Sequence, residues 1–110
     1  MSRLKPETLL AAKVIGAFRT LGAKCLRLHS GKVRVRGGWM HQNEEGTADW
    51  MILFPGGVSR FVEIKVPGET PKPKQLEWRS DVERLGFVCD VVTTLEEALA
   101  VAREARKGKR

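Results

Sequence analysis

The sequence predicts an α/β domain with a mixed central β-sheet flanked by helices. Two observations lead to this class. Apolar residues recur at helical spacing in three segments, and short alternating or continuously apolar stretches lie between them. The expected order is helix, three strands, helix, strand and helix (α-β-β-β-α-β-α). The crossover through the middle helix is expected to be right-handed and to join parallel strands.

Residues 5–21 predict the first helix. Its apolar stripe comprises Leu10, Val14, Ala17, Phe18 and Leu21. Gly22 is suited to end the helix. Glu7 lies on the same stripe, and the periodicity leaves two interpretations open. It is either a charge favoured near the positive helix N-terminus or a functional carboxylate.

Two alternating segments follow, residues 24–30 and 32–36, and both are typical of half-exposed strands. Arg34 and Arg36 share a face of the second segment because they are two residues apart. The Gly37-Gly38 pair and the polar stretch 41–47 predict a mobile loop.

A β-hairpin is predicted next. Residues 48–54 form a buried strand, residues 55–57 (Pro-Gly-Gly) form the turn, and residues 59–66 form the second arm.

A second helix is predicted over residues 71–85, with Thr70 as its N-cap and Pro71 in its first turn. Its inner stripe comprises Gln75, Trp78, Val82 and Leu85. Residues 87–92 then form another strand.

The last helix is capped by Thr94, with Glu97 at the capping-box position. Its inner face comprises Leu95, Ala98, Leu99 and Ala102. A basic tail follows from about residue 104. We expect residues 1–110 to form a single domain, because 110 residues suffice for one core.

Composition indicates a polyanion partner. The net charge is +7 and the pI is about 9.9, which favours nucleic acid over a merely basic soluble protein. Cys25 and Cys89 lie in apolar surroundings and predict reduced core thiols. We expect a cytoplasmic protein, because neither a signal-like segment nor a membrane-length apolar run is visible.

The candidate site is carried by Asp49, Glu63 and Lys65. Glu63 and Lys65 are two apart on a predicted strand, so they share one face. Asp49 begins the neighbouring strand and can lie beside them. Two carboxylates and an ammonium on a rigid sheet suit a hard divalent cation and phosphodiester hydrolysis. The alternative is a plain cross-strand ion pair.

This pattern resembles the catalytic motif of the PD-(D/E)xK nuclease superfamily. Glu7 in a leading helix, Gly46 three before Asp49, and Gly68 and Gln75 after the Glu-x-Lys strand extend the likeness over residues 4 to 93. Together they resemble the VRR-NUC family, the virus-type replication-repair nucleases. One departure is Ala48, where the family pattern usually has Pro. The positions that match the family's functional residues are Glu7, Asp49, Glu63, Lys65 and Gln75.

The resemblance implies a restriction-endonuclease-like core. It also implies a small nuclease, bacterial or phage-encoded, that forms homodimers, and some family members resolve four-way DNA junctions. The chemistry indicates Mg²⁺ or Mn²⁺ bound by Asp49, Glu63 and the backbone carbonyl of Ile64. Lys65 would position or deprotonate a water, or stabilise the transition state. Glu7 and Gln75 would lie in the outer part of the site, where they fix waters or a second metal, with Glu7 as a candidate metal ligand. We expect both within about 10 Å of Glu63, the span of a metal and its water shell.

Basic and aromatic residues outside the site have two interpretations each. Lys32, Arg34 and Arg36 are either a phosphate-contacting edge or a charged edge that avoids pairing. Lys72 and Lys74 are better placed to hold phosphates. His29, His41 and Trp39 are candidates for substrate contact, or surface and interface residues. Trp50 and Trp78 are predicted core residues.

We therefore expect a metal-dependent DNA endonuclease, a homodimer that cuts structured DNA, with four-way junctions preferred. Two alternatives remain open. One is a nuclease acting on flaps or ends, or a nickase. The other is a non-catalytic nucleic-acid-binding module.

Overall fold

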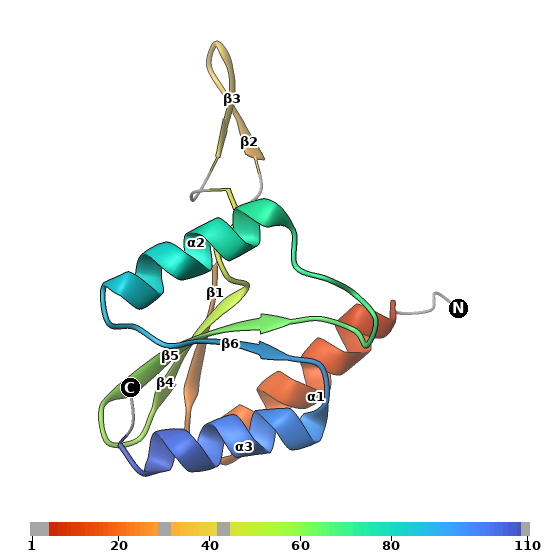
Figure 1. Cartoon of the computed structure of the whole chain (residues 1–110). Coiled ribbons are helices and arrows are strands. Elements are labelled where there is room, and N and C mark those ends of the chain that lie inside the picture. The colour runs from red at the N-terminus through yellow and green to blue at the C-terminus, as the bar shows by residue number, and fades with distance from the viewer. Residues whose placement is uncertain (1–4, 29–31, 42–44, 109–110) are drawn as a thin grey trace.

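The computed structural model describes residues 5–28, 32–41 and 45–108. The elements in chain order (Figure 1) are α1 (Pro6–Thr20), β1 (Lys24–Arg27), β2 (Lys32–Val35), β3 (Gly38–His41), β4 (Trp50–Phe54), β5 (Val58–Ile64), α2 (Pro73–Arg84), β6 (Cys89–Val92) and α3 (Leu95–Arg106). None of these described helices is long and apolar enough to cross a membrane.

The main sheet has four strands in the order β1-β4-β5-β6. β4 pairs antiparallel with both β1 and β5, and β5 pairs parallel with β6 across the α2 crossover. The predicted hairpin is confirmed, with Trp50 opposite Val62 and Phe54 opposite Val58. Helices α1 and α3 cover one face of the sheet and α2 covers the other (Figure 1). The predicted mixed α/β class is confirmed.

Strand β5 divides its side chains between the two faces. Val58, Val62 and Ile64 are buried in the core under α1 and α3, so the odd-numbered residues face α2. Phe61 contacts Trp78 of α2 edge to face, with ring centroids 5.1 Å apart. Because both faces are covered, Ile64 and its two neighbours in the chain are all buried.

The core between the sheet, α1 and α3 is apolar and closely packed. Helix α1 buries Val14, Ile15 and Phe18, and Phe18 meets Phe54 edge to face at 5.4 Å. Helix α3 buries Ala98, Val101, Ala102 and Ala105. The predicted inner face of α3 was therefore wrong at Leu95, which is 41% exposed. The stripe that is buried has the same helical spacing, and its small residues let α3 lie close to its neighbours.

The cap of α3 confirms the sequence prediction. The Thr94 hydroxyl accepts a hydrogen bond from the Glu97 N–H at 3.1 Å. The Glu97 carboxylate accepts from the Thr93 N–H at 2.7 Å and from the Thr93 hydroxyl at 2.6 Å. These hydrogen bonds lower the pKa of Glu97, as expected for a carboxylate that satisfies donors at a helix N-terminus.

Helix α2 begins at Pro73, two residues later than predicted, and its N-cap is Lys72 rather than Thr70. A residue before proline is restricted to extended conformations, and Lys72 has φ −76° and ψ 155°. Pro73 therefore prevents the helix from including residues 71 and 72. The side-chain oxygen of Gln75 accepts a hydrogen bond from the Lys72 N–H at 2.8 Å.

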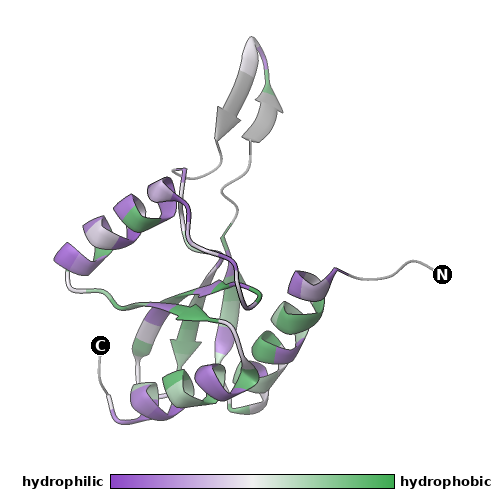
Figure 2. Ribbon diagram, turned by 45° about the vertical axis from the view of Figure 1, so that its right-hand side comes forward, coloured by the Kyte–Doolittle hydropathy of each residue, from purple (hydrophilic) through white to green (hydrophobic). Residues whose placement is uncertain are grey.

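Helix α2 packs loosely and buries no residue fully. Its half-buried residues are Gln75, Trp78, Arg79 and Val82, and the others are exposed. The predicted stripe was thus wrong at Leu85, which is 74% exposed. Trp78 packs on Phe61 but lies outside the main core, contrary to prediction. Figure 2 shows the contrast between the mostly hydrophilic α2 and the more hydrophobic α1.

Strands β2 and β3 form a separate two-stranded ribbon that projects beyond α2 (Figure 1). Strand β3 was missed in the sequence, where Gly37 and Gly38 were interpreted as loop residues. Gly37 has φ +91°, which a tight hairpin turn requires and which glycine adopts without steric cost. The same glycines therefore close a ribbon, and five strands precede α2.

Other predicted bounds were too wide. Strand β1 ends at Arg27 among the described residues, β5 ends at Ile64, and β6 begins at Cys89. The predicted basic tail is partly helical, because α3 continues to Arg106. Both cysteines are free, as predicted, and burial raises the pKa of the Cys89 thiol to about 12.

Gly46 ties the segment before β4 to the start of α2. It has φ +89°, and a Cβ at this position would lie 2.2 Å from the backbone oxygen of Lys74. Only glycine permits this approach. The approach positions the residues that lead into Asp49 against the first turn of α2.

We expect Gly46→Ala to destabilise the fold by more than the ~1–2 kcal/mol that a left-handed conformation alone costs, because the methyl group also overlaps the α2 backbone. Urea denaturation measures the loss. Gly56→Ala is the matched control, since Gly56 has φ +91° and open space around it. Equal losses in the two variants would contradict the close approach.

Candidate active site

Asp49 lies immediately before β4 and is fixed from two sides. Its backbone carbonyl accepts a hydrogen bond from the Leu28 N–H at 2.9 Å. Its carboxylate Oδ2 accepts from the Ile64 N–H at 3.1 Å. The Asp49 side chain thus occupies the place where the β4–β5 ladder would continue, next to the C-terminal end of β5.

Ile64 presents a second backbone group at this place. In a β-strand, the N–H and C=O of one residue point to the same neighbouring strand. The Ile64 carbonyl therefore faces the side on which its N–H meets Asp49. This orientation is compatible with its predicted role as an oxygen ligand.

Glu63 is 8% exposed and lies on the α2 face of the sheet. Because Trp50 is opposite Val62, Asp49 falls opposite Glu63 where the strands continue. Burial raises the pKa of the Glu63 carboxyl, and the charge of Asp49 raises it further. The charges of Lys65 and Arg79 act in the opposite direction. This combination is typical of functional carboxylates.

Lys65 is also 8% exposed. Its N–H donates to the Val92 carbonyl at 3.0 Å, which extends the β5–β6 pairing by one residue. Lys65 therefore keeps the strand geometry and shares the α2 face with Glu63. The structure brings Asp49, Glu63 and Lys65 together at one end of one sheet face.

Glu7 and Gln75 lie at the starts of α1 and α2. Glu7 is exposed and forms no hydrogen bond or ion pair with the described residues. Figures 1 and 2 show the first turn of α1 near the connection that follows β5. The capping hydrogen bond of Gln75 explains a polar residue at that position without a metal. Their proximity to Glu63 stays a prediction.

Arg79 is a residue that sequence reasoning missed. It lies on the inner stripe of α2, four residues after Gln75, and it lines a small cavity together with Glu63 and Trp78. A cation at helical spacing from Gln75 and Trp78 was a usable signal. It was overlooked because Leu85 completed an apolar stripe.

The residues present fit a hard divalent cation. The described residues hold no cluster of three or more His, Cys, Asp or Glu side chains, so the donor set comprises two carboxylates and the Ile64 carbonyl. Mg²⁺ commonly takes one or two protein carboxylates and completes its shell with water and substrate oxygens. A cation there would also offset the repulsion between Asp49 and Glu63.

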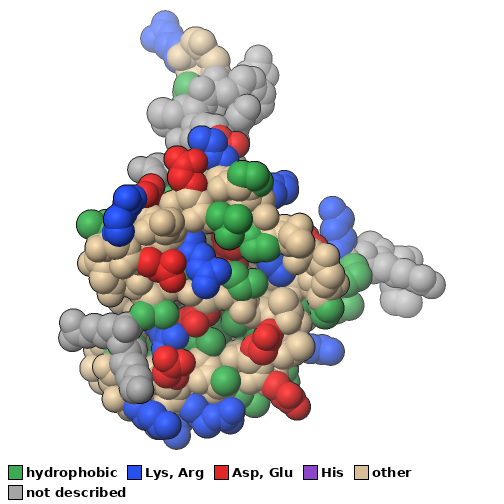
Figure 3. All heavy atoms as spheres, viewed as in Figure 1, with side chains coloured by type: hydrophobic (Ala, Val, Ile, Leu, Met, Phe, Trp, Pro, Cys, Tyr) green, Lys and Arg blue, Asp and Glu red, His purple; other side chains and the backbone are tan. Residues whose placement is uncertain are grey.

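The predicted basic residues lie near α2 and on the ribbon. Lys72 and Lys74 are exposed at the start of α2, where Lys74 forms an exposed ion pair with Glu77 at 3.7 Å. Arg36 is exposed at the ribbon turn. Figure 3 shows Lys and Arg side chains at the ribbon tip and along α2, interspersed with Asp and Glu.

Several other predictions fall on residues that the structure does not describe fully. His29 lies outside the described residues. The backbone register places Arg34 opposite Trp39 and Lys32 opposite His41, while their side chains lie outside the description. Trp50 packs against the core cluster, as predicted, and the Arg27 guanidinium lies 5.6 Å from its ring centroid.

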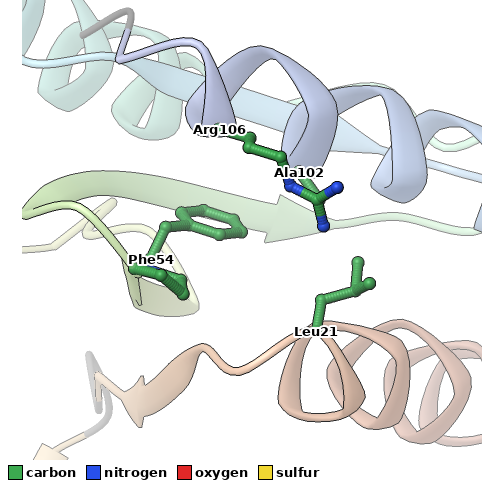
Figure 4. A pocket seen from close by; sticks show the side chains of 5 residues that line it. Leu21, Phe54, Ala102 and Arg106 are labelled. Atoms are coloured by element: carbon green, nitrogen blue, oxygen red, sulfur yellow. The ribbon is translucent and has the colours of Figure 1, made fainter.

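A separate cavity of about 210 Å³ lies between the end of α1, the β4–β5 turn and α3 (Figure 4). Leu21, Phe54, Pro55, Ala102 and Arg106 line it. It is on the opposite sheet face from Glu63 and at the opposite end of β4 from Asp49. Its lining offers no carboxylate, so it does not resemble a metal site.

No family model matches the chain, and no curated protein does. Among solved structures, one labelled VRR_NUC domain matches with a TM-score of 0.73 and 21% sequence identity, covering 89% of this chain and 95% of that chain. The chain therefore has the fold of a VRR_NUC domain. The predicted resemblance is confirmed at the level of the fold.

The raised pKa of Glu63 predicts a pH dependence of stability in the metal-free protein. The folded state holds the Glu63 proton more tightly than the unfolded state. The free energy of unfolding should therefore fall as pH rises from the ordinary value of 4.5 through the raised pKa. Glu63→Gln should remove this component, so its advantage over wild type should grow with pH in that window. Urea denaturation across pH measures it, and a constant difference would contradict the argument.

Proposed function

We propose that this protein is a metal-dependent DNA endonuclease of the VRR-NUC family. The observation that carries the proposal is the Asp49 carboxylate, held at the Ile64 N–H beside buried Glu63 and Lys65, in a VRR_NUC fold. Few structural roles require two carboxylates to lie side by side in a partly buried position. A site for a cation that acts on phosphodiesters accounts for both of them.

Asp49, Glu63 and the Ile64 carbonyl would hold Mg²⁺ or Mn²⁺. When bound, such an ion stabilises charge on the phosphoryl oxygens and lowers the pKa of a coordinated water. Lys65 shares the sheet face of Glu63, and we assign it to positioning the attacking water and to stabilising negative charge. Glu7 and Gln75 would order water in the outer part of the site.

The preferred substrate is branched DNA, with four-way junctions first. The excess of positive charge favours a polyanion, and no base-reading motif indicates sequence-specific recognition. Homodimerisation would set two sites about a twofold axis, which matches cleavage of symmetric strands. A flap- or end-acting nuclease, or a nickase, would use the same site.

The proposal is tested by incubating the protein with labelled duplex, flap, fork and four-way DNA in the presence of Mg²⁺ or Mn²⁺. Asp49→Asn and Glu63→Gln should each lower cleavage at least about 100-fold, the scale of losing a group that stabilises transition-state charge. Folding and DNA binding should persist, because neither residue belongs to the apolar core.

Asp81→Asn and Glu77→Gln are the matched controls, since both residues are exposed on α2. Metal-dependent turnover retained in both site variants would refute the assignment. Calorimetry of Mn²⁺ binding to wild type and Asp49→Ala separates a nuclease from a non-catalytic DNA-binding module.

The ribbon gives a separate prediction about DNA binding. Neutralising Arg34 and Arg36 should weaken binding to all DNA sequences alike. It should also reduce the salt dependence by roughly one unit of slope for each phosphate that the variant no longer neutralises. Binding is measured by fluorescence anisotropy between about 50 and 200 mM salt. An unchanged slope would show that this segment is a solvated edge or a protein interface.

A further inference from the structure

Arg79 is a charged residue on the side of α2 that faces the sheet, where an apolar residue would be expected. The half-buried stripe of α2 consists of Gln75, Trp78, Arg79 and Val82, so Arg79 occupies a position where the helix meets the sheet. The sheet face beneath α2 is the one that carries Glu63. Arg79 and Glu63 line the same small cavity, and their charges interact.

The ion pairing of Arg79 leaves most of its donors available. Its Nε lies 3.7 Å from the Glu83 carboxylate, and the two side chains are 38% and 47% exposed. An exposed pair of this kind contributes little to stability. No other ion pair of Arg79 is found among the described residues, and a guanidinium has five N–H donors.

Arg60 shows what a structural arginine looks like in this fold. It is on β5 but faces the core, its side chain is 2% exposed, and it donates two hydrogen bonds to Asp90 at 2.8 and 3.0 Å. Two of its nitrogens are thus committed to the partly buried Asp90 carboxylate, whose side chain is 19% exposed. Arg79 has a weak partner, Glu83, without such commitment.

We propose that Arg79 binds the phosphodiester that is presented to Asp49 and Glu63, and thereby acts as a substrate-binding catalytic residue. This inference rests on the proposed nuclease function. The planar guanidinium matches phosphate oxygens with two parallel hydrogen bonds. The weak contact with Glu83 can yield to a phosphate at little cost.

Charge balance supports this role. Asp49 and Glu63 place two carboxylates at the site, and an incoming phosphate adds a further negative charge. Lys65 directly follows β5 on the sheet face of Glu63, and Arg79 lies on α2 and lines a small cavity with Glu63. The Lys65 ammonium from the sheet and the Arg79 guanidinium from α2 would then both contact the phosphate. Two contacts would fix the orientation of the phosphate as well as offset its charge.

The experiment compares Arg79→Ala, Arg79→Lys and Arg84→Ala. Arg84 is the matched control because it lies on the same helix, is exposed and pairs only with Asp81 among the described residues. Three quantities are measured for each: cleavage of the best substrate of the wild type, Mn²⁺ affinity by calorimetry, and DNA binding without divalent cation as a function of salt.

Arg79→Ala should lower kcat about 100-fold and reduce the salt slope of binding by about one unit, while Mn²⁺ affinity and Tm stay near wild type. Compared with Arg79→Ala, Arg79→Lys should restore the salt slope of DNA binding but only part of kcat. Lysine keeps the positive charge but lacks the planar guanidinium that donates two parallel hydrogen bonds. Arg84→Ala should resemble wild type in all three.

Three outcomes would overturn the inference. Equal cleavage and binding in Arg79→Ala and Arg84→Ala would make Arg79 a surface residue. If Arg79→Ala loses cleavage together with a matching loss of Mn²⁺ affinity or of Tm, the role of Arg79 would be to position Glu63 and not to bind phosphate. An unchanged salt slope in Arg79→Ala would refute phosphate binding. These outcomes differ from failure of the proposed function, in which the wild type itself cleaves no substrate.

Discussion

The alternation of β5 between two covered faces is the constraint on which the rest of the structure depends. Val62 and Ile64 point into the core under α1 and α3, whereas Glu63 and Lys65 lie on the α2 face. A slip of one residue in the register would bury both charges among apolar side chains. The packing of the core therefore also sets the register of the candidate site.

The two faces of the main sheet differ in how tightly they are packed, and the candidate site lies on the more loosely packed one. The face under α1 and α3 is filled by interlocking apolar side chains, including the Phe18–Phe54 pair. On the face under α2, Phe61 contacts Trp78 and Phe87 edge to face, and no residue of α2 is fully buried. Glu63 and Lys65 are each 8% exposed under this loosely packed helix, and burial there raises the pKa of Glu63.

Charged residues that are buried or partly buried occur in two arrangements in this fold, an ion pair and a pair of like charges. Arg60 and Asp90 form a bidentate pair on the core face, with one further guanidinium nitrogen, Nη1, buried without a partner among the described residues. That pair links β5 to β6 through two charge-assisted hydrogen bonds. Asp49 and Glu63 carry like charges side by side, and their mutual repulsion indicates a ligand rather than a structural bond.

The sequence by itself determined the elements that depend on local signals. The Pro-Gly-Gly turn defined the β4–β5 hairpin, Thr94 and Glu97 defined the start of α3, and the spacing of Asp49, Glu63 and Lys65 placed them on one face. The sequence also placed Gln75, Trp78 and Val82 on the side of α2 that faces the sheet. Only the tertiary structure decided which residue completes that side, because packing against Phe61 fixes the rotation of the helix. That choice put Arg79 inside and Leu85 outside. The β2–β3 ribbon likewise depended on strand pairing, which glycine-rich sequence does not specify.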